Sequence, residues 1–179
     1  MASILRFDNW QHSDGTSIAT TDASGNISFA GSGAGKILQV VSTTKTDSFT
    51  TTSTSLVDIT GLTLSITPTS ATSKVFVTCN GVAGNTGSTE TTFFDFVRDS
   101  TSIGVGTGGT INATTLVYDN NTATGIPFSA SFLDSPATTS ATTYKLQMKV
   151  NGGTGVLGRI AINDVNRAIT TITVMEVSA

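Results

Sequence analysis

The chain has 179 residues, of which 12% are charged and 37% hydrophobic, and its formal net charge is −3. This length suits one domain of ordinary size, or one domain with an appended arm, that can bury a full core. The weak acidic charge excludes the basic footprint that nucleic-acid binding requires, and no apolar run approaches the roughly 20 residues of a membrane span.

Residues 1–35 differ from the rest of the chain and predict an arm. Within it, Thr16–Ala30 reads as two short strands around a turn. The glycine-rich link GSGAG at Gly31–Gly35 follows, and repeated glycine favours a connection over strand pairing. We therefore expect an N-terminal arm with a hairpin over residues 1–35 and a second domain over residues 36–179.

The second domain repeats strand signals with a period of two. The clearest is Tyr144–Val150, where Tyr, Leu, Met and Val alternate with Lys, Gln and Lys, the pattern of a half-buried strand. We expect further strands at Ile37–Val41, Leu62–Ile66, Val75–Val77, Phe93–Val97, Ile111–Tyr118, Ile126–Phe132, Arg159–Ile162 and Ile169–Val177. No window predicts an amphipathic helix, so the fold class is all-β, an antiparallel β-sandwich of jelly-roll type.

Catalytic and cofactor motifs are matched only in part. The run GSGAGK at residues 31–36 lacks the glycine spacing of a phosphate-binding loop. Residues Gly104–Gly109 match GxGxxG but precede a predicted strand instead of a helix. His12 and Cys79 are the sole histidine and thiol, and they lie in the arm and in a predicted core strand. We expect no cofactor, and no intrachain disulfide can form.

The carboxylates favour neither a metal site nor a catalytic pair. Asp119–Asn121 could ligate calcium in a loop but lack the regular spacing of a dedicated site, so we expect no metal. Asp95 and Asp99 alternate onto one strand face and would be the acid pair of a polysaccharide depolymerase if they faced a groove. The neighbouring Arg98 favours an ordinary ion pair instead.

Aromatic residues indicate two contact surfaces. Phe93, Phe94 and Phe96 place rings on both faces of one strand, which suits either a subunit interface or a central strand with a bulge. Phe7 and Trp10 lie in an arm that is too short to form a hydrophobic core of its own. We expect these two rings to dock on the chain's own sandwich or on a neighbouring protein and so to anchor the arm.

Polar loops between the predicted strands could bond the hydroxyl groups of a sugar. They contain short amide and hydroxyl side chains that suit glycan recognition, although plain solvated loops have the same composition. The candidate ligand residues in these loops are Asn85, Thr110, Asn120, Asn121 and Asn151.

Five segments together resemble a family of virion proteins of marine tailed phages, labelled tail-fibre or structural proteins. The resemblance spans residues 36–177, through KILQVV, KTDSFTTTSTSLVDITGLTLSITPTSATSKVFV, VRDSTSIGVG, FLDSPATTSATTYKLQMKV and TITVMEV. It implies a trimer-forming β-sandwich on the virion exterior, with other capsid or tail proteins as partners. The single cysteine is compatible with synthesis in a reducing host cytoplasm. The family has no catalytic motif, so the resemblance implies a non-enzymatic structural protein.

The length of the arm bears on where such a protein would sit. Fully extended, about 35 residues at roughly 3.3 Å each span little more than about 100 Å. A host-reaching fibre needs a longer stem, so we expect a capsid decoration or short appendage. The alternatives are a tail-fibre receptor-binding protein that recognises host surface glycan and a polysaccharide depolymerase.

Overall fold

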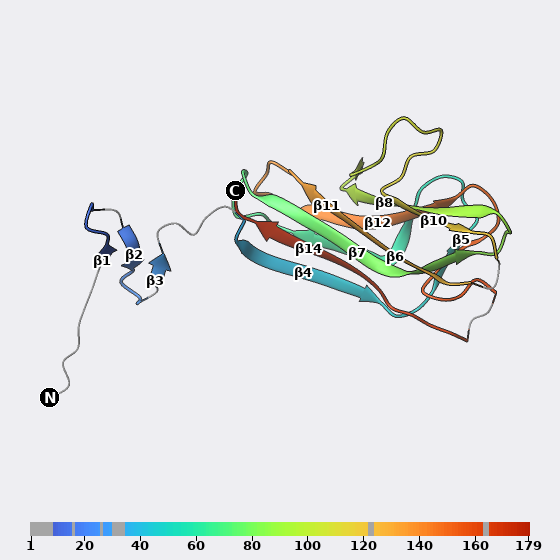
Figure 1. Ribbon diagram of the computed structural model, residues 1–179, viewed down its shortest axis with the longest axis horizontal. Helices are drawn as coiled ribbons and strands as arrows, with labels where there is room; N and C mark the ends of the chain where they lie inside the picture. The colour runs from blue at the N-terminus through green and yellow to red at the C-terminus, as the bar shows by residue number, and fades with distance from the viewer. Residues whose placement is uncertain (1–8, 16, 26, 30–34, 122–123, 163–164) are drawn as a thin grey trace. The chain divides into compact units, whose positions relative to one another are not determined.

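The computed structural model describes residues 9–15, 17–25, 27–29, 35–121, 124–162 and 165–179. All regular elements in these ranges are β-strands, and none of the ranges contains a helix that could cross a membrane. The chain divides into two compact units, Met1–Lys36 and Ile37–Ala179 (Figure 1).

The first unit is a small antiparallel sheet of three strands in the order β1-β2-β3, namely β1 (Asn9–Gln11), β2 (Ser17–Thr21) and β3 (Ile27–Phe29). The turn between β2 and β3 closes through a hydrogen bond from the Gly25 amide to the Asp22 carbonyl, 2.9 Å long. Gly25 has a φ of +83°, which glycine adopts without steric cost. The predicted hairpin is confirmed, and β1 adds a third strand.

The first sheet of the second unit is built around β7 (Lys74–Asn85). β14 (Thr170–Val177) pairs with one edge of β7 and β11 (Ile126–Asp134) with the other, while β4 (Ile37–Lys45) pairs with the far edge of β14. Two short strands, β13 (Gly155–Leu157) and β5 (Phe49–Thr51), continue the sheet from the end of β7. All these pairings are antiparallel.

The second sheet has the order β6-β12-β8-β10 and is also antiparallel. Its strands are β6 (Val57–Ile66), β12 (Thr142–Val150), β8 (Glu90–Arg98) and β10 (Thr115–Asp119), and β9 (Thr101–Ile103) pairs with the end of β8. Figure 1 shows the two sheets as two layers that face each other.

The strand order identifies the fold. The eight main strands in chain order are β4, β6, β7, β8, β10, β11, β12 and β14. When these strands are numbered one to eight, they lie side by side as 1-8-3-6 in the first sheet and as 2-7-4-5 in the second. This order is the double Greek key of a jelly roll, an architecture found in viral capsid proteins, lectins and cupins. The predicted fold class is confirmed.

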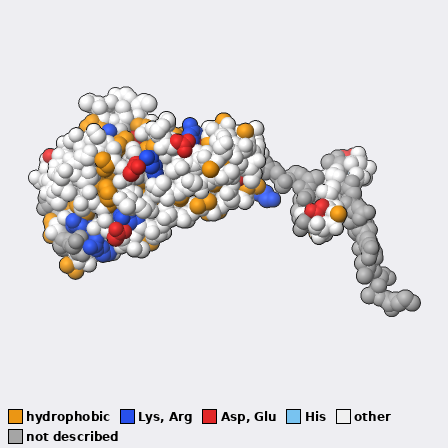
Figure 2. All heavy atoms as spheres, turned by 180° about the vertical axis from the view of Figure 1, so that it is seen from behind, with side chains coloured by type: hydrophobic (Ala, Val, Ile, Leu, Met, Phe, Trp, Pro, Cys, Tyr) orange, Lys and Arg blue, Asp and Glu red, His pale blue; other side chains and the backbone are white. Residues whose placement is uncertain are grey.

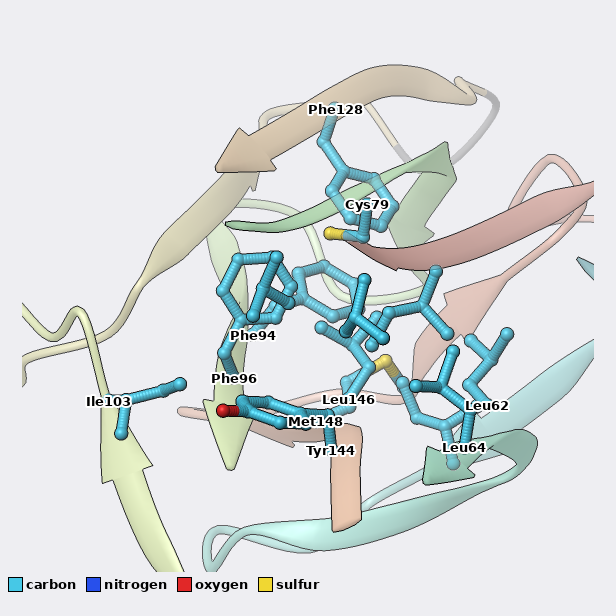
Figure 3. Close-up of a cluster of buried hydrophobic side chains, with 14 of the residues drawn as sticks. Leu62, Leu64, Cys79, Phe94, Phe96, Ile103, Phe128, Tyr144, Leu146 and Met148 are labelled. Atoms are coloured by element: carbon cyan, nitrogen blue, oxygen red, sulfur yellow. The ribbon is translucent and has the colours of Figure 1, made fainter. Parts of the chain in front are cut away.

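The core lies between the two sheets and follows the predicted alternation (Figure 3). In β12, Tyr144, Leu146 and Met148 are buried while the lysines and glutamine between them face outward. Phe94 of one sheet stacks on Phe128 of the other, with ring centroids 4.4 Å apart and planes 8° from parallel. This aromatic pair joins the two layers.

Three local expectations were wrong. Residues Arg159–Ile162 form no strand, only an isolated bridge between Arg159 and Arg167. The strand expected at Ile111–Tyr118 begins at Thr115. β7 continues through Gly84, well beyond the strand expected at Val75–Val77. A Cβ on Gly84 would lie 2.8 Å from the Thr124 carbonyl oxygen, so glycine is needed there for close packing within a strand.

Candidate functional surfaces

The outward side of the sheet β4-β14-β7-β11 carries a continuous row of apolar side chains. Val40, Met175, Phe76 and Leu133 come from the four strands in turn and are direct partners in the pairing register. Val40 is 55% exposed and Leu133 51%, while the middle pair is half-buried. We call this set the apolar row.

Two further rows on the same side consist almost entirely of hydroxyl side chains. Ser42 bonds Thr173 at 2.8 Å and Thr44 bonds Thr171 at 3.0 Å, in each case oxygen to oxygen across the strand pair. Such cross-strand hydroxyl pairs stabilise a sheet surface without adding charge. The rows are Ser42, Thr173, Thr78, Ser131 and then Thr44, Thr171, Asn80, Ser129. The apolar row and these two rows together are called the flat face below.

The two sheets differ in the charge of their outward sides. On β12 and its neighbours, Lys145 pairs with Asp58 at 2.9 Å, and the Lys149 ammonium lies 5.8 Å from the centre of the Phe93 ring. At the end of the flat face, Lys74 donates to the Ser135 hydroxyl at 2.8 Å. In the view of Figure 2, basic and acidic side chains lie in small groups on an otherwise mostly uncharged surface.

The predicted phenylalanine interface is only partly accessible. Phe94 and Phe96 point into the sandwich and are fully buried, so assigning them to a subunit interface was wrong. Alternation along β8 turns them toward the opposite sheet. Phe93 faces outward, but only 6% of it is exposed, since it is covered by neighbours that include Lys149.

The acid pair expected of a depolymerase does not face a groove. Asp95 is buried, and its carboxylate accepts a hydrogen bond from the Thr114 amide at 3.2 Å. Asp99 lies beyond the end of β8, where its carboxylate accepts the Thr143 amide at 3.0 Å. Both side chains hold backbone in place, and Arg98 pairs with Asp134 instead of either of them.

Among the loop residues proposed to bind glycan, Asn85 has a structural role. It is fully buried, donates to the Gly152 carbonyl at 3.1 Å and accepts the Gly87 amide at 2.9 Å. These hydrogen bonds connect two loops, so the buried side-chain amide of Asn85 is not accessible to a ligand. Asn151 is exposed, and its side-chain oxygen accepts the Thr91 amide at 2.6 Å.

Of the remaining loop candidates, Asn120 and Asn121 lie on a turn next to the buried Asp119, and Thr110 lies on another loop. Asp119 accepts hydrogen bonds from the Asn121 amide at 2.9 Å and the Thr124 hydroxyl at 2.6 Å, which closes the turn after β10. Asn120 and Asn121 are exposed on this turn. Thr110 is exposed on the separate loop between β9 and β10.

Of the predicted anchor residues, Trp10 lies in β1 and is 61% exposed. Phe7 lies outside the described residues. Cys79 of β7 is buried in the core, and this burial raises the pKa of its thiol to about 12. The thiol is therefore protonated at neutral pH, which makes it a poor nucleophile.

Glu176 of β14 is a buried carboxylate that sequence reasoning missed. One of its oxygens accepts the Thr69 amide and hydroxyl, both at 2.7 Å, and the other accepts the Gln39 amide at 2.6 Å. Burial alone would raise the pKa of Glu176, but the hydrogen bonds from Gln39, Thr69 and Ser73 outweigh it and lower the pKa to about 2. The ionised form thus clamps the loop before β7 to β14 and β4.

This clamp predicts acid sensitivity. Because the folded-state pKa lies below the ordinary value of 4.5, the stabilisation is complete above pH 4.5 and is lost as the pH falls toward 2. Urea unfolding between pH 7 and pH 2 should show this loss, and Glu176→Gln should be less stable at pH 7 with a flatter profile in that window. An unchanged profile would show that Glu176 is not the clamp.

Comparisons with known proteins give neither a family nor a curated relative, since no family model and no curated protein matches the chain. Several solved structures are similar at low identity. They include the Gt strain of infectious bursal disease virus (13% identity, TM-score 0.44), its Gx strain (14%, 0.42) and the VP2 subviral particle of the virus (15%, 0.36).

These likenesses add nothing to the functional case. The matches cover 86% of this chain but only 40%, 40% and 44% of the respective viral chains, so the chain spans less than half of their length. At such identities and TM-scores they carry no argument about function. The fold assignment rests on the strand order of this chain.

Proposed function

We propose that this chain is a non-enzymatic structural protein of a phage virion surface, a homotrimeric capsid decoration or short appendage. The observation that carries the proposal is the small first unit, in which Trp10 and Ile27 are both more than 60% exposed. A three-stranded sheet of this size cannot bury such side chains itself, so an external contact would stabilise it. The sequence resemblance names the partner as another virion protein.

The jelly roll suits this role as the displayed body. Its outward strand positions present many hydroxyl side chains, and in the view of Figure 2 charged side chains are few. Such a surface has little electrostatic attraction for nucleic acid. The first unit would then hold the body on the capsid or tail.

The anchoring role predicts a loss of occupancy. Replacing Phe7 and Trp10 together by Ala should cost several kcal/mol of binding, about the value of aromatic hot spots, and remove most of the protein from particles. Quantitative mass spectrometry of purified particles measures the occupancy. The matched control is His12→Ala with Asp14→Ala, two exposed residues of the same unit that should leave occupancy unchanged. Full occupancy of the aromatic double variant would contradict anchoring by the arm.

The second candidate is a tail-fibre protein that recognises host surface glycan. It is favoured by Asn120 and Asn151, whose exposed amides could bond sugar hydroxyls. Binding of the purified protein to host cells, competed by their surface polysaccharide and weakened by Asn120→Ala with Asn151→Ala, would support it. The depolymerase alternative has no structural support, since Asp95 is buried under the Thr114 backbone.

A further inference from the structure

We propose that the flat face is the surface through which copies of this chain pack against one another. This inference rests on the proposed self-assembly of the protein and adds the surface that performs it. It does not depend on the role in a virion, because it concerns contacts between identical chains alone.

The apolar row supplies the centre of such a contact. Val40, Met175, Phe76 and Leu133 follow the pairing register across four strands, so the row is straight and crosses the whole sheet. Ile37 and Leu38, both exposed, extend the apolar surface toward the start of β4. Interface centres are enriched in Met and aromatic side chains, and the two middle members of the row are Met175 and Phe76.

Charge favours a second copy as the occupant of this face. The three rows of the flat face contain no charged residue, and all their members belong to the described part of the chain. Lys74, which alternation places on the same side of β7, lies beyond the apolar row and donates to Ser135. When two identical surfaces pack together, a charged side chain lies near the same charge on the other copy and is repelled by it. An uncharged face avoids that repulsion. The outward side of the other sheet holds Lys145, Lys149 and Asp58, which would remain in water.

The flat face is more accessible than the interface around Phe93 that the sequence suggested. Phe93 is only 6% exposed within one chain, so a second copy would gain little contact area there. Val40 and Leu133 are each about half exposed and gain the most from being covered. The surface still open to burial therefore lies on the flat face and not on β8.

The area of the flat face is that of a weak contact between copies. Four strands about 4.8 Å apart give a width of about 19 Å, and about seven residues at roughly 3.3 Å give a length of about 23 Å. Each copy thus offers about 440 Å², about half of the roughly 800 Å² that each partner contributes to an interface of standard size, so we expect an association that depends on concentration. If the strands run along a three-fold axis, the three apolar rows lie at one height and form a single apolar layer.

The test is the association state of the purified full chain, measured by light scattering and sedimentation over a range of concentrations. We expect wild-type trimers, and at least tenfold weaker association for Val40→Lys with Leu133→Lys. The matched control is Leu116→Lys, at a leucine that is 53% exposed on β10 of the other sheet. It should associate like wild type. A monomeric wild type, or equal association of all three proteins, would overturn the proposal.

A second measurement avoids dependence on the lysine variants folding. Ser42→Cys places a thiol on the flat face, Ser65→Cys places one on the other sheet, and the native Cys79 is buried. A short bis-maleimide should link copies of Ser42→Cys at least tenfold faster than copies of Ser65→Cys. Equal rates would reject the flat face. Particle occupancy of the Phe7 and Trp10 variant is measured separately, so failure here is distinguishable from failure of the anchoring proposal.

Discussion

Replacing Phe94 by Ala should destabilise the jelly roll by about 3–5 kcal/mol, because it removes a fully buried ring from between the sheets. The ring stacks on Phe128 of the opposite sheet, so the substitution leaves a cavity and also breaks an aromatic contact between the layers. Urea unfolding monitored by circular dichroism measures the change, and the loss should appear as a lower transition midpoint with little change in slope.

The matched control for Phe94→Ala is Leu116→Ala. Leu116 lies on the neighbouring strand β10 with its side chain half exposed, so its removal should cost less than about 1 kcal/mol. A Phe94→Ala variant with wild-type stability but weaker association would contradict the core placement. It would restore the interface role that the sequence suggested for this ring.

The fold could be predicted from the sequence because alternation is a local property. In β12, each residue from Tyr144 to Val150 takes the side that its polarity predicts, and the same holds for Thr171 to Val174 of β14. Sheet order and register depend on contacts between distant segments. The short strands β5 and β13 were missed for this reason, since only their partners distinguish them from loops.

The candidate surfaces were less predictable for the same reason. Val40, Phe76, Leu133 and Met175 are up to 135 residues apart in sequence (175 minus 40), and only the register places them in one row. Phe94 was misassigned because a strand with rings on both sides gives no local signal for which side faces the opposite sheet. The depolymerase pair failed because the loop that covers Asp95 comes from residues further along the chain.

The buried polar contacts had no sequence signal at all. Glu176 ends a strand and reads as a surface charge, yet its partners Thr69 and Gln39 lie more than 100 residues earlier. No sequence pattern indicated a buried role for Asp134 either. The hydrogen-bond donors of both carboxylates can be identified only in the structure, and we expect both carboxylates to stabilise the fold.

Asp134 joins the two sheets through a network of three side chains. It lies at the end of β11, and its carboxylate accepts hydrogen bonds from Arg98 of β8 at 2.8 Å and from the Tyr144 hydroxyl of β12 at 2.7 Å. Burial raises the pKa of Tyr144, and the hydrogen bond to Asp134 raises it further. The phenol therefore remains a donor throughout the physiological pH range.

Asp134→Ala should cost about 3 kcal/mol, because it leaves a partly buried guanidinium and a buried hydroxyl without their acceptor. Tyr144→Phe removes one donor and should cost less, about 1–2 kcal/mol. The control is Asp58→Ala, which breaks the more exposed pair with Lys145 and should cost under about 1 kcal/mol. Urea unfolding of the three variants at pH 7 gives the ranking. If Asp134→Ala cost no more than Asp58→Ala, the network would not hold the sheets together, and the apolar core would account for their packing alone.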